Sequence, residues 1–569
     1  MRGISDALPG WIALVLALAG VAYSALVVPA TPGGPTEATY RLQAESLGRD
    51  GDRVYSESDR DRFASREWTT RGTRIEVSLE RETLRFHRPL PYSAALAPFV
   101  RIAPERGPYL LNLLLLGGLA LALGVRLHRD SPRGAPYWSL ALVAGTVSFA
   151  YVRAVWSELF VGALLVGAYL LTRDEAPRRE LPEMAPESPA RGLFVLRWFG
   201  VGALLALATL QEPLYAVFLP AVLVPAFRSR DEVAWASAIG SFSLILAAAW
   251  LAGGVLFPGV APWWPDAGVP VRAGDSLADV GEWAARLQAV EAPGLVWDPL
   301  LSLWNVVYAL VGRHAGWVPC FLPLVVLAAT GRRHRWPIWG AMTLVLVATI
   351  TLDPFNIAGG PEAIGYRRLV PPALLAFFAV RPERAAVPAA AAAALGVAVL
   401  APLWIGLADS PGRLRGRSFA RPVAAVLPYE TSQRSVPASA EVFSRLFLAR
   451  TANDGLLPGS GGDHFVLRAG ARGEIVVASA GRLAHLDFEF GPGAPSELEV
   501  DGGEVENLLF RPQGGVTFRV VPATPRIRHR IWGRDDIHFL HMLTISMPSS
   551  EGRDQPFSLT GRSAGDGAS

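Results

Sequence analysis

The stretch Trp11-Ile-Ala-Leu-Val-Leu-Ala-Leu-Ala-Gly-Val-Ala-Tyr-Ser-Ala-Leu-Val-Val28 decides the class of fold, because it carries no charged side chain over its whole length. A helix needs about 20 predominantly apolar residues to cross a bilayer. The run follows a short leader with Arg2, exceeds the apolar core of a usual secretory signal and lacks a clear small-x-small cleavage site. We therefore interpret it as an uncleaved first membrane helix whose N-terminus lies inside.

Similar apolar runs recur as far as Leu407, and the composition agrees with them. Hydrophobic residues make up 51% of the chain, and its mean hydropathy is +0.30. With the first run, the predicted spans make about eleven crossings of a helical polytopic membrane bundle. The further spans are predicted at about 108–127, 136–153, 157–172, 197–211, 213–227, 235–257, 315–330, 337–352, 368–380 and 386–407.

The distribution of arginine predicts the orientation of these spans. Short cytoplasmic loops are enriched in basic residues, and here alternate connections carry them. An odd number of crossings then places the N-terminus in the cytoplasm and the C-terminus outside. The arginines of the predicted cytoplasmic connections are Arg126, Arg129, Arg133, Arg173, Arg178, Arg179, Arg228, Arg230, Arg332, Arg333, Arg335, Arg381 and Arg384.

The basic residues also bear on location and partners. The chain contains no lysine, which is typical of GC-biased bacterial coding, so we expect a bacterial inner membrane. The net charge is only +3, and the arginines are scattered through short loops, which argues against a nucleic-acid partner. Membrane lipids are the expected surroundings. Cys320 is the only cysteine, which excludes an internal disulfide and a thiolate metal cluster.

Two long connections are predicted to lie on the outer side. Loop 29–107 is polar and rich in both charge signs, and Tyr40, Ala44 and Leu47 share one helical face in it. This pattern predicts a short helix on the membrane surface. Segment 258–314 is rich in tryptophan, which is typical of the headgroup layer, so it is predicted to lie along the interface.

The composition changes after Leu407. Short runs of alternating polarity, separated by glycine and proline, predict an extracytoplasmic antiparallel β-sandwich of about eight strands. The predicted domains are therefore 1–409, a membrane domain that includes 29–107 and 258–314, and 410–569, a β-rich domain. The clearest alternating runs are Phe465–Arg468, Glu474–Ala478, His485–Phe490, Val516–Val521 and Phe539–Met547.

Two acidic residues lie where predicted spans meet the outer side: Glu37 after the first span and Glu158 just before the fourth. Such residues are costly to desolvate and are functional candidates by default. Other chemistries lack their motifs, since HExxH, GxxxxGK[ST] and a GxGxxG between a strand and a helix are all missing. No metal site is predicted, because the aspartates between Asp50 and Asp61 alternate with arginines and predict a salt-bridged surface.

Four segments resemble motifs of one family. Gly34-Pro-Thr-Glu-Ala-Thr-Tyr40, with Gln43-Ala-Glu-Ser-Leu47 and Asp50-Gly-Asp52, resembles the opening of the first periplasmic loop in bacterial GT-C glycosyltransferases. This superfamily includes the protein O-mannosyltransferases and the lipid A aminoarabinose transferases. The resemblance covers roughly residues 1–410, the membrane part of the chain. The other matching segments are Phe86-His-Arg-Pro-Leu-Pro-Tyr92, Val155-Trp-Ser-Glu-Leu159 and Gly359-Gly-Pro-Glu-Ala-Ile-Gly-Tyr-Arg-Arg-Leu-Val-Pro371.

The resemblance implies transfer of a sugar from a polyprenyl-phosphate donor to a glycan, lipid or protein acceptor. It implies that Glu37 and Glu158 line the reaction site and that Arg367, with Arg368, faces the lipid phosphate. These residue types suit the reaction, because a carboxylate can remove the acceptor's proton and a planar guanidinium can bind phosphate. No cofactor is implied beyond the lipid-linked donor, and a divalent cation stays open. The candidate substrate-binding residues are His87, Tyr40, Trp156 and His314.

The chain departs from the family pattern at Thr36, where the family usually has aspartate before the glutamate. Because a hydroxyl is no base near neutral pH, either Glu37 takes this role or catalysis is lost. The alternative function is a noncatalytic or transport-like membrane protein that retains the bundle. The candidates also have structural interpretations: Glu37 in a helix dipole, Glu158 paired with Arg153, Arg367 and Arg368 as interfacial anchors, His87 as a headgroup contact and His314 in a helix-entry turn.

Overall fold

The architecture is that of a computed structural model of the chain, and every statement below concerns the residues it describes. These are residues 7–28, 35–66, 74–80, 83–172, 189–228, 231–255, 269–288, 299–312, 316–331, 333–334, 336–352, 365–382, 386–407, 419–424, 426–428, 447–451, 456–458, 465–467, 469–470, 472–479, 483–510, 515–523, 527–530, 537–547 and 554–563.

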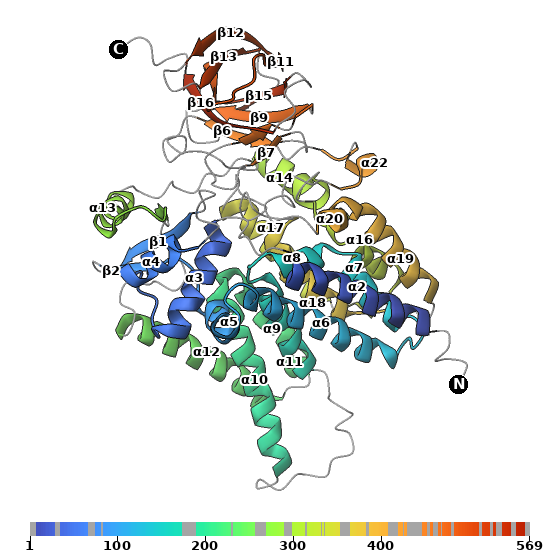
Figure 1. The fold of residues 1–569 in the computed structure, drawn as a ribbon. Coiled ribbons are helices and arrows are strands. Elements are labelled where there is room, and N and C mark those ends of the chain that lie inside the picture. The colour runs from blue at the N-terminus through green and yellow to red at the C-terminus, as the bar shows by residue number, and fades with distance from the viewer. Residues whose placement is uncertain are drawn as a thin grey trace.

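The described chain is mostly helical with a β-rich C-terminal part. Figure 1 shows the strands of the C-terminal part at one end of the helices, while the long helix α10 extends from the opposite end. The helices up to residue 255, outside the first loop, are α2 (Leu8–Val27), α6 (Gly107–His128), α7 (Ala135–Ala144), η2 (Val147–Phe149), α8 (Ala150–Arg153), α9 (Glu158–Leu171), α10 (Pro189–Gln211), η4 (Pro213–Val217), α11 (Phe218–Arg228) and α12 (Glu232–Val255). The later helices are α13 (Leu277–Gln288), α14 (Pro299–Val311), α15 (Trp317–Cys320), α16 (Leu322–Thr330), α17 (Trp336–Leu352), η5 (Arg367–Leu369), α18 (Val370–Ala379), α19 (Ala386–Val399), α20 (Ala401–Gly406) and α22 (Arg421–Ala424), with a short β4–β5 pair (Arg333–His334, Val380–Arg381).

Several of these helices are long and apolar enough to cross a membrane. Among the described residues there are four: Leu8–Val27, Gly107–His128, Gly192–Gln211 and Glu232–Leu251. The bent pair Ala135–Ala144 and Val147–Arg153 makes a fifth if it is counted as one span. The other predicted spans correspond to shorter or broken apolar helices, so the count of eleven crossings is not confirmed.

The predicted continuous span 136–153 is in fact bent by 58°. At the bend, the Thr146 hydroxyl accepts a hydrogen bond from the Ser148 amide at 3.2 Å and so caps the new helical turn. Gly145 lies so close to α16 that a Cβ there would be 2.8 Å from Pro323 Cγ. A side chain on Gly396 of α19 would lie 2.4 Å from the Gly145 carbonyl oxygen. The bend is therefore set by the close approach of α7, α16 and α19, which hydropathy alone does not reveal.

This close approach predicts that Gly396→Ala destabilises the bundle. The new methyl group would force α19 away from α7, and overpacking of this kind costs about 1–3 kcal/mol. We expect a lower thermal midpoint for the full chain in detergent. Gly340→Ala in α17 is the matched control, because its added Cβ would meet nothing within 4 Å. Equal midpoints for the two variants would show that α7 and α19 do not require this contact.

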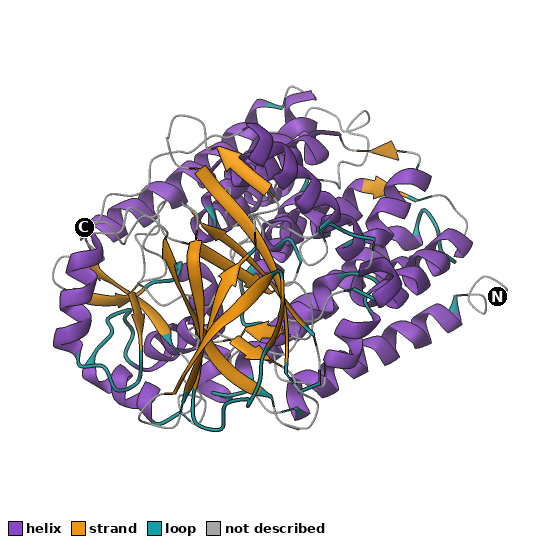
Figure 2. Ribbon diagram, turned by 90° about the horizontal axis from the view of Figure 1, so that it is seen from above, coloured by secondary structure: helices purple, strands orange, loops and turns teal. Residues whose placement is uncertain are grey.

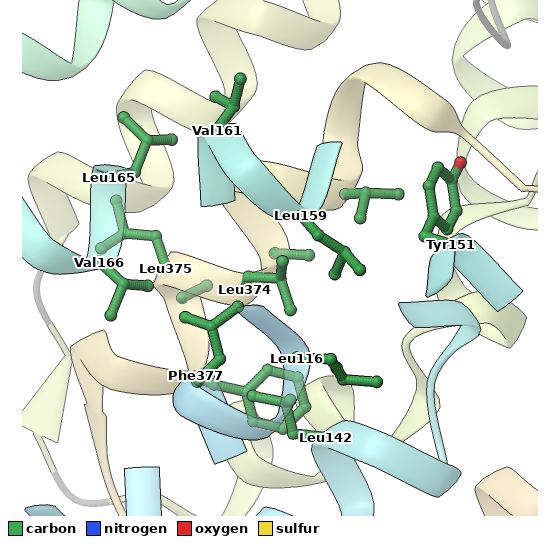
Figure 3. Packing of buried hydrophobic residues seen from close by; sticks show 14 of the residues in the cluster. Leu116, Leu142, Tyr151, Leu159, Val161, Leu165, Val166, Leu374, Leu375 and Phe377 are labelled. Atoms are coloured by element: carbon green, nitrogen blue, oxygen red, sulfur yellow. The ribbon is translucent and has the colours of Figure 1, made fainter. Parts of the chain in front are cut away.

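The packing of α9 against α18 positions the candidate site. Leu159, Leu165 and Val166 of α9 face Leu374, Leu375 and Phe377 of α18 in one buried cluster (Figure 3). Gly162 permits this approach, since a Cβ there would lie 2.5 Å from Leu374 Cδ1. Every residue of α18 is buried. The contact places the first residue of α9, Glu158, next to η5, the short helix that precedes α18.

The first loop forms a small α/β unit. It contains α3 (Pro35–Arg49), α4 (Glu57–Ala64), β1 (Ile75–Glu80), β2 (Thr83–Phe86) and α5 (Leu90–Ile102). Strand β3 (Val269–Val271), from the tryptophan-rich segment, pairs antiparallel with β1 and completes a sheet in the order β2-β1-β3. The predicted interfacial segment thus contributes a strand to this sheet, which its composition did not indicate.

The prediction that α3 lies on the membrane surface is wrong. Residues 36–46 of this helix are all buried. One face, with Tyr40 and Ala44, packs in the main helical core. The opposite face, with Ala38 and Leu42, packs against the side chains of the small sheet. The helix is buried because it is covered on both sides, by the bundle and by a sheet that the sequence analysis did not predict.

The C-terminal part is built from two antiparallel sheets (Figure 2). Side chains from both sheets meet in a single core, among them Ile475, Leu486 and Leu543. The alternating runs were correctly predicted as strands, but the described strands number eleven and not about eight, because several short strands lack clear alternation. One sheet has the order β12-β13-β10-β16-β8-β7 (Gly503–Phe510, Val516–Pro522, Leu483–Phe490, Gln555–Ser563, Phe465–Leu467, Leu456–Pro458), and the other β11-β15-β9-β6 (Glu499–Asp501, Ile537–Ser546, Gly473–Ser479, Phe447–Thr451), with β14 (Ile527–Arg530) paired to β15.

Candidate functional site

Glu158 and Arg367 form a buried ion pair at the start of α9. The Arg367 Nε donates to Glu158 Oε1. Their side chains are only 7% and 14% exposed, respectively. The Arg367 guanidinium also lies over the Trp156 ring, 4.8 Å from its centroid. An aromatic face attracts a cation in this position, so Trp156 and Glu158 together hold the guanidinium in place.

The ion pair leaves one carboxylate oxygen without a protein partner. Among the described residues, Glu158 Oε2 is buried and accepts no hydrogen bond. An unsatisfied buried oxygen costs about 1–3 kcal/mol, and more when it is charged. Such atoms in folded proteins call for an explanation, and a hydrogen-bond donor on a bound substrate is one.

Arg153 is not the partner of Glu158, so that structural interpretation was wrong. Its Nη1 donates to the backbone carbonyls of Ser24, at 2.7 Å, and Val28, at 3.1 Å. These carbonyls belong to the C-terminal end of α2, where a cation is favoured by the helix dipole. Arg153 therefore anchors the first helix, and Glu158 is paired with an arginine more than two hundred positions away.

Tyr40 connects the first loop to this ion pair. Its hydroxyl accepts a hydrogen bond from Gln211 Nε2 at 2.8 Å and also interacts with Ser157, next to Glu158. The phenol interacts electrostatically with both Arg367 and Glu158. Burial raises the pKa of Tyr40 above its usual value although nearby arginines oppose the shift. Tyr40 therefore remains a neutral hydrogen-bonding group.

Glu37 lies in the first turn of α3 and is only 1% exposed. It interacts electrostatically with Arg153 and Tyr109. Tyr92 interacts electrostatically with both Glu37 and Glu158, so the two predicted carboxylates belong to one polar cluster. The position of Glu37 also suits the helix dipole, which was its structural alternative.

Thr36, the residue that departs from the family pattern, contacts a second ion pair. Arg88 Nη2 donates to Thr36 Oγ1 at 2.9 Å and pairs with Glu76 Oε2. The Arg88 guanidinium lies 5.9 Å from the centroid of the Tyr40 ring. The Glu76 side chain is 26% exposed, which makes it far more accessible than Glu37. A partly exposed carboxylate is thus present near Tyr40.

The remaining predicted residues differ in how they relate to this cluster. His87 is partly buried, and burial together with Arg88 and Arg53 lowers the pKa of its imidazole to about 3. It is neutral at pH 7 and supplies no positive charge for a phosphate. The backbone carbonyl of Arg368 accepts a hydrogen bond from the Tyr215 hydroxyl at 3.1 Å. His314 lies outside the described residues.

The sequence analysis missed three polar residues that organise the site. Gln211 bridges two segments, because its Oε1 also accepts a hydrogen bond from the Tyr92 amide at 3.0 Å. Asn112, fully buried in α6, accepts from the Tyr92 hydroxyl at 3.0 Å. Gln211 and Asn112 could have been selected from the sequence, because each is a polar residue in or at the end of an apolar run. Glu76 had no such signal, because only the pairing of β1 with its neighbours places it.

The described residues contain no group of three or more histidine, cysteine, aspartate and glutamate side chains arranged to hold a metal ion. The site is therefore a cluster of carboxylates, guanidinium groups and phenols. It collects Tyr40 from the first loop, Trp156 from the segment before α9, Glu158 from the first turn of α9, and Arg367 from η5. Such a cluster can neutralise an anion and orient a hydroxyl group.

These features define a mostly helical protein with several apolar helices, a β-rich C-terminal part and a buried ionic site. No protein-family model matches the chain, and no curated protein matches it in sequence. Among solved structures it is similar to ArnT from Cupriavidus metallidurans. The crystal structure bound to undecaprenyl phosphate aligns with a TM-score of 0.33 and 15% identity over 65% of this chain and 59% of that one. The apo structure aligns with a TM-score of 0.35 and 15% identity over 75% and 67%, respectively. At these TM-scores the likeness assigns no role to any residue.

Proposed function

We propose that the chain is a membrane glycosyltransferase of the GT-C type. It would transfer a sugar from a polyprenyl-phosphate-linked donor to an acceptor at the outer face of the inner membrane. The observation that carries this proposal is the convergence of Tyr40, Glu158 and Arg367 on one cluster. They come from three different segments that resemble family motifs, and they are far apart in the sequence. A shared site is the simplest reason for the three motifs to occur in one chain.

The residue types in the cluster fit the chemistry of an inverting transfer. The acceptor oxygen forms a bond to the anomeric carbon of the sugar while the bond from that carbon to the phosphate oxygen breaks. A carboxylate takes the acceptor's proton, and polyprenyl phosphate leaves with the developing negative charge. We assign the base to Glu37, acceptor orientation to Glu158 and the phosphate to Arg367, with Arg368 beside it. A preorganised guanidinium stabilises a leaving phosphate strongly in a site that excludes water.

Burial imposes a condition on this mechanism. Glu37 is 1% exposed, so an acceptor reaches it only if the first loop moves when substrates bind. Glu76 is the accessible carboxylate of the cluster and is held by Arg88 close to Thr36. Because Glu76 is accessible, we assign acceptor binding to it, and Glu37 remains the proposed base.

The C-terminal β-rich part is proposed to cover the site or to dock the acceptor. It stands at one end of the helical part (Figure 1). Its acidic residues are engaged in surface contacts: Asp487 accepts two hydrogen bonds from Arg519, both at 2.8 Å. This bidentate arrangement on neighbouring strands is a structural pair and does not resemble a catalytic centre.

The test is sugar transfer by the full chain reconstituted in liposomes. Polyprenyl-phosphate sugars carrying labelled hexose, pentose or amino sugar would be supplied with extracts that contain glycan, lipid and protein acceptors. We expect label from at least one donor to move to an acceptor fraction and free polyprenyl phosphate to accumulate with it. If no donor is consumed and no polyprenyl phosphate binds, the noncatalytic alternative is correct.

A further inference from the structure

The cation proposed to bind the donor phosphate is already engaged by a carboxylate. Arg367 donates through Nε to Glu158, and both side chains are largely buried. The phosphodiester of a bound donor at this guanidinium would place a second anion beside Glu158. Two negative charges this close repel each other strongly where water is excluded. The carboxylate of Glu158 and the phosphate therefore compete for the guanidinium of Arg367.

We infer that Glu158 is a competitive internal ligand of Arg367, which the donor phosphate displaces before the acceptor can bind. This inference rests on the proposed function and adds an order of binding to it. With the donor absent, Glu158 fills the anion position. With the donor present, the phosphate takes the guanidinium, and the released carboxylate accepts a hydrogen bond from the acceptor's hydroxyl group.

The surroundings of the pair favour an exchange of partners over a collapse of the site. The Arg367 guanidinium lies over the Trp156 ring, 4.8 Å from the ring centroid. This cation–π contact uses the flat face of the guanidinium, so it does not depend on which anion binds to the N–H groups at the edge of the guanidinium. The charge of Arg367 therefore remains compensated when the phosphate replaces the carboxylate, and the released carboxylate of Glu158 is stabilised by the hydrogen bond from the acceptor's hydroxyl group.

Glu158 is also equipped to act after release. Its Oε2 is buried and has no hydrogen-bond partner among the described residues. This oxygen can therefore accept a hydrogen bond from the hydroxyl group of the acceptor. Ser157 precedes it in the chain, and Tyr40 interacts with both residues. Without the positive charge of Arg367, a buried carboxylate holds a hydrogen-bonded proton more tightly. Donor binding thus converts a paired, inactive carboxylate into an acceptor-binding group.

The test measures binding of undecaprenyl phosphate to the full chain in detergent. Glu158→Gln removes the competing charge but keeps the size of the side chain. We expect its dissociation constant for undecaprenyl phosphate to be lower than that of the wild type by about tenfold or more. A tenfold change corresponds to about 1.4 kcal/mol of competition from the carboxylate of Glu158. The same variant should transfer sugar more slowly, because its amide is a poor substitute for the carboxylate that orients the acceptor. Opposite changes in affinity and turnover are not produced by a residue with a merely structural role.

Two controls make the result specific. Glu57→Gln removes an exposed carboxylate that pairs with Arg60 on α4, and it should leave the affinity unchanged. Undecaprenol, which lacks the phosphate, should show no difference between the wild type and Glu158→Gln. If Glu158→Gln does not fold, Glu158→Asp serves instead, because its shorter carboxylate withdraws from Arg367 and should also tighten binding.

The outcomes separate this inference from the function on which it rests. If the wild type binds undecaprenyl phosphate and folded Glu158→Gln binds it equally or more weakly, competition by Glu158 is refuted while the proposed function stands. If neither protein binds the lipid, the proposed function fails and the inference with it. Binding by Glu158→Gln alone would be the strongest form of the expected result.

Discussion

Glu37→Gln is expected to lower the rate of sugar transfer by about 10²–10⁴-fold, the range in which a positioned general base contributes. Glutamine keeps the size of the side chain and much of its hydrogen bonding, but it cannot take the acceptor's proton. Glu37 is buried and interacts electrostatically with Arg153, so loss of its charge should also lower the stability of the folded protein. The measurement is single-turnover transfer from a labelled polyprenyl-phosphate sugar, alongside thermal unfolding of the same preparation.

Glu76→Gln is the informative comparison, because Glu76 is the accessible carboxylate beside Thr36. Because this substitution removes an acceptor-binding group, it should raise the KM for the acceptor. It should lower kcat less than Glu37→Gln does. Unchanged activity in Glu37→Gln together with a 10²-fold or greater loss of kcat in Glu76→Gln would transfer the role of base to Glu76. Since Thr36 is no base near neutral pH, unchanged activity in both variants would leave the first loop without a catalyst.

Arg367→Lys is expected to weaken binding of the donor tenfold or more while the protein remains folded. A hydrogen bond to a charged group contributes about 1.5–3 kcal/mol, and lysine lacks the planar guanidinium that can bind a phosphate through two parallel hydrogen bonds. Its ammonium still compensates the buried charge of Glu158, so stability should change little. Arg367→Ala has no such compensation, and an unpaired buried carboxylate should cost about 3–5 kcal/mol.

The two substitutions of Arg367 therefore separate binding from folding. The KM for the donor and the thermal midpoint would be measured for both variants in the same detergent. We expect a raised KM with a near-normal midpoint for lysine and a lowered midpoint for alanine. An unchanged KM in the lysine variant would mean that the donor phosphate is held elsewhere, and Arg367 would then be only the structural partner of Glu158.

Hydropathy predicted the parts of the fold that depend on local sequence. Helices α2 and α6 agree with the first two predicted spans, because long uninterrupted apolar runs leave no alternative. Strands β9 and β13 agree with their predicted runs for a similar reason, since alternation fixes which side chains face the core. The bend at Gly145 was not predictable, because it depends on Pro323 and Gly396 from other helices.

The burial of α3 was missed because its buried residues are largely polar. Their charges are compensated by partners distant in the sequence: Arg66 pairs with both Glu45 and Glu105, and Arg41 lies over the Tyr109 ring, 4.8 Å from its centroid. A sequence pattern reveals apolar faces but not which charges will meet. The surface-helix prediction followed the average polarity of the segment, whereas tertiary contacts decided the outcome.

The candidate site was predictable one residue at a time but not as an arrangement. Tyr40, Trp156, Glu158 and Arg367 were selected from motifs, and they lie together in one cluster. The pairing of Glu158 with Arg367 and not with the nearby Arg153 was unforeseen, because the α9–α18 contact determines it.

A structure of the full chain with undecaprenyl phosphate bound tests the central claim most directly. The account predicts that the phosphate lies within hydrogen-bond distance of the Arg367 guanidinium, still over Trp156, and that Glu158 has separated from Arg367. A lipid phosphate bound away from Arg367, with the Glu158–Arg367 pair intact, would contradict both the donor site and the exchange of partners proposed here.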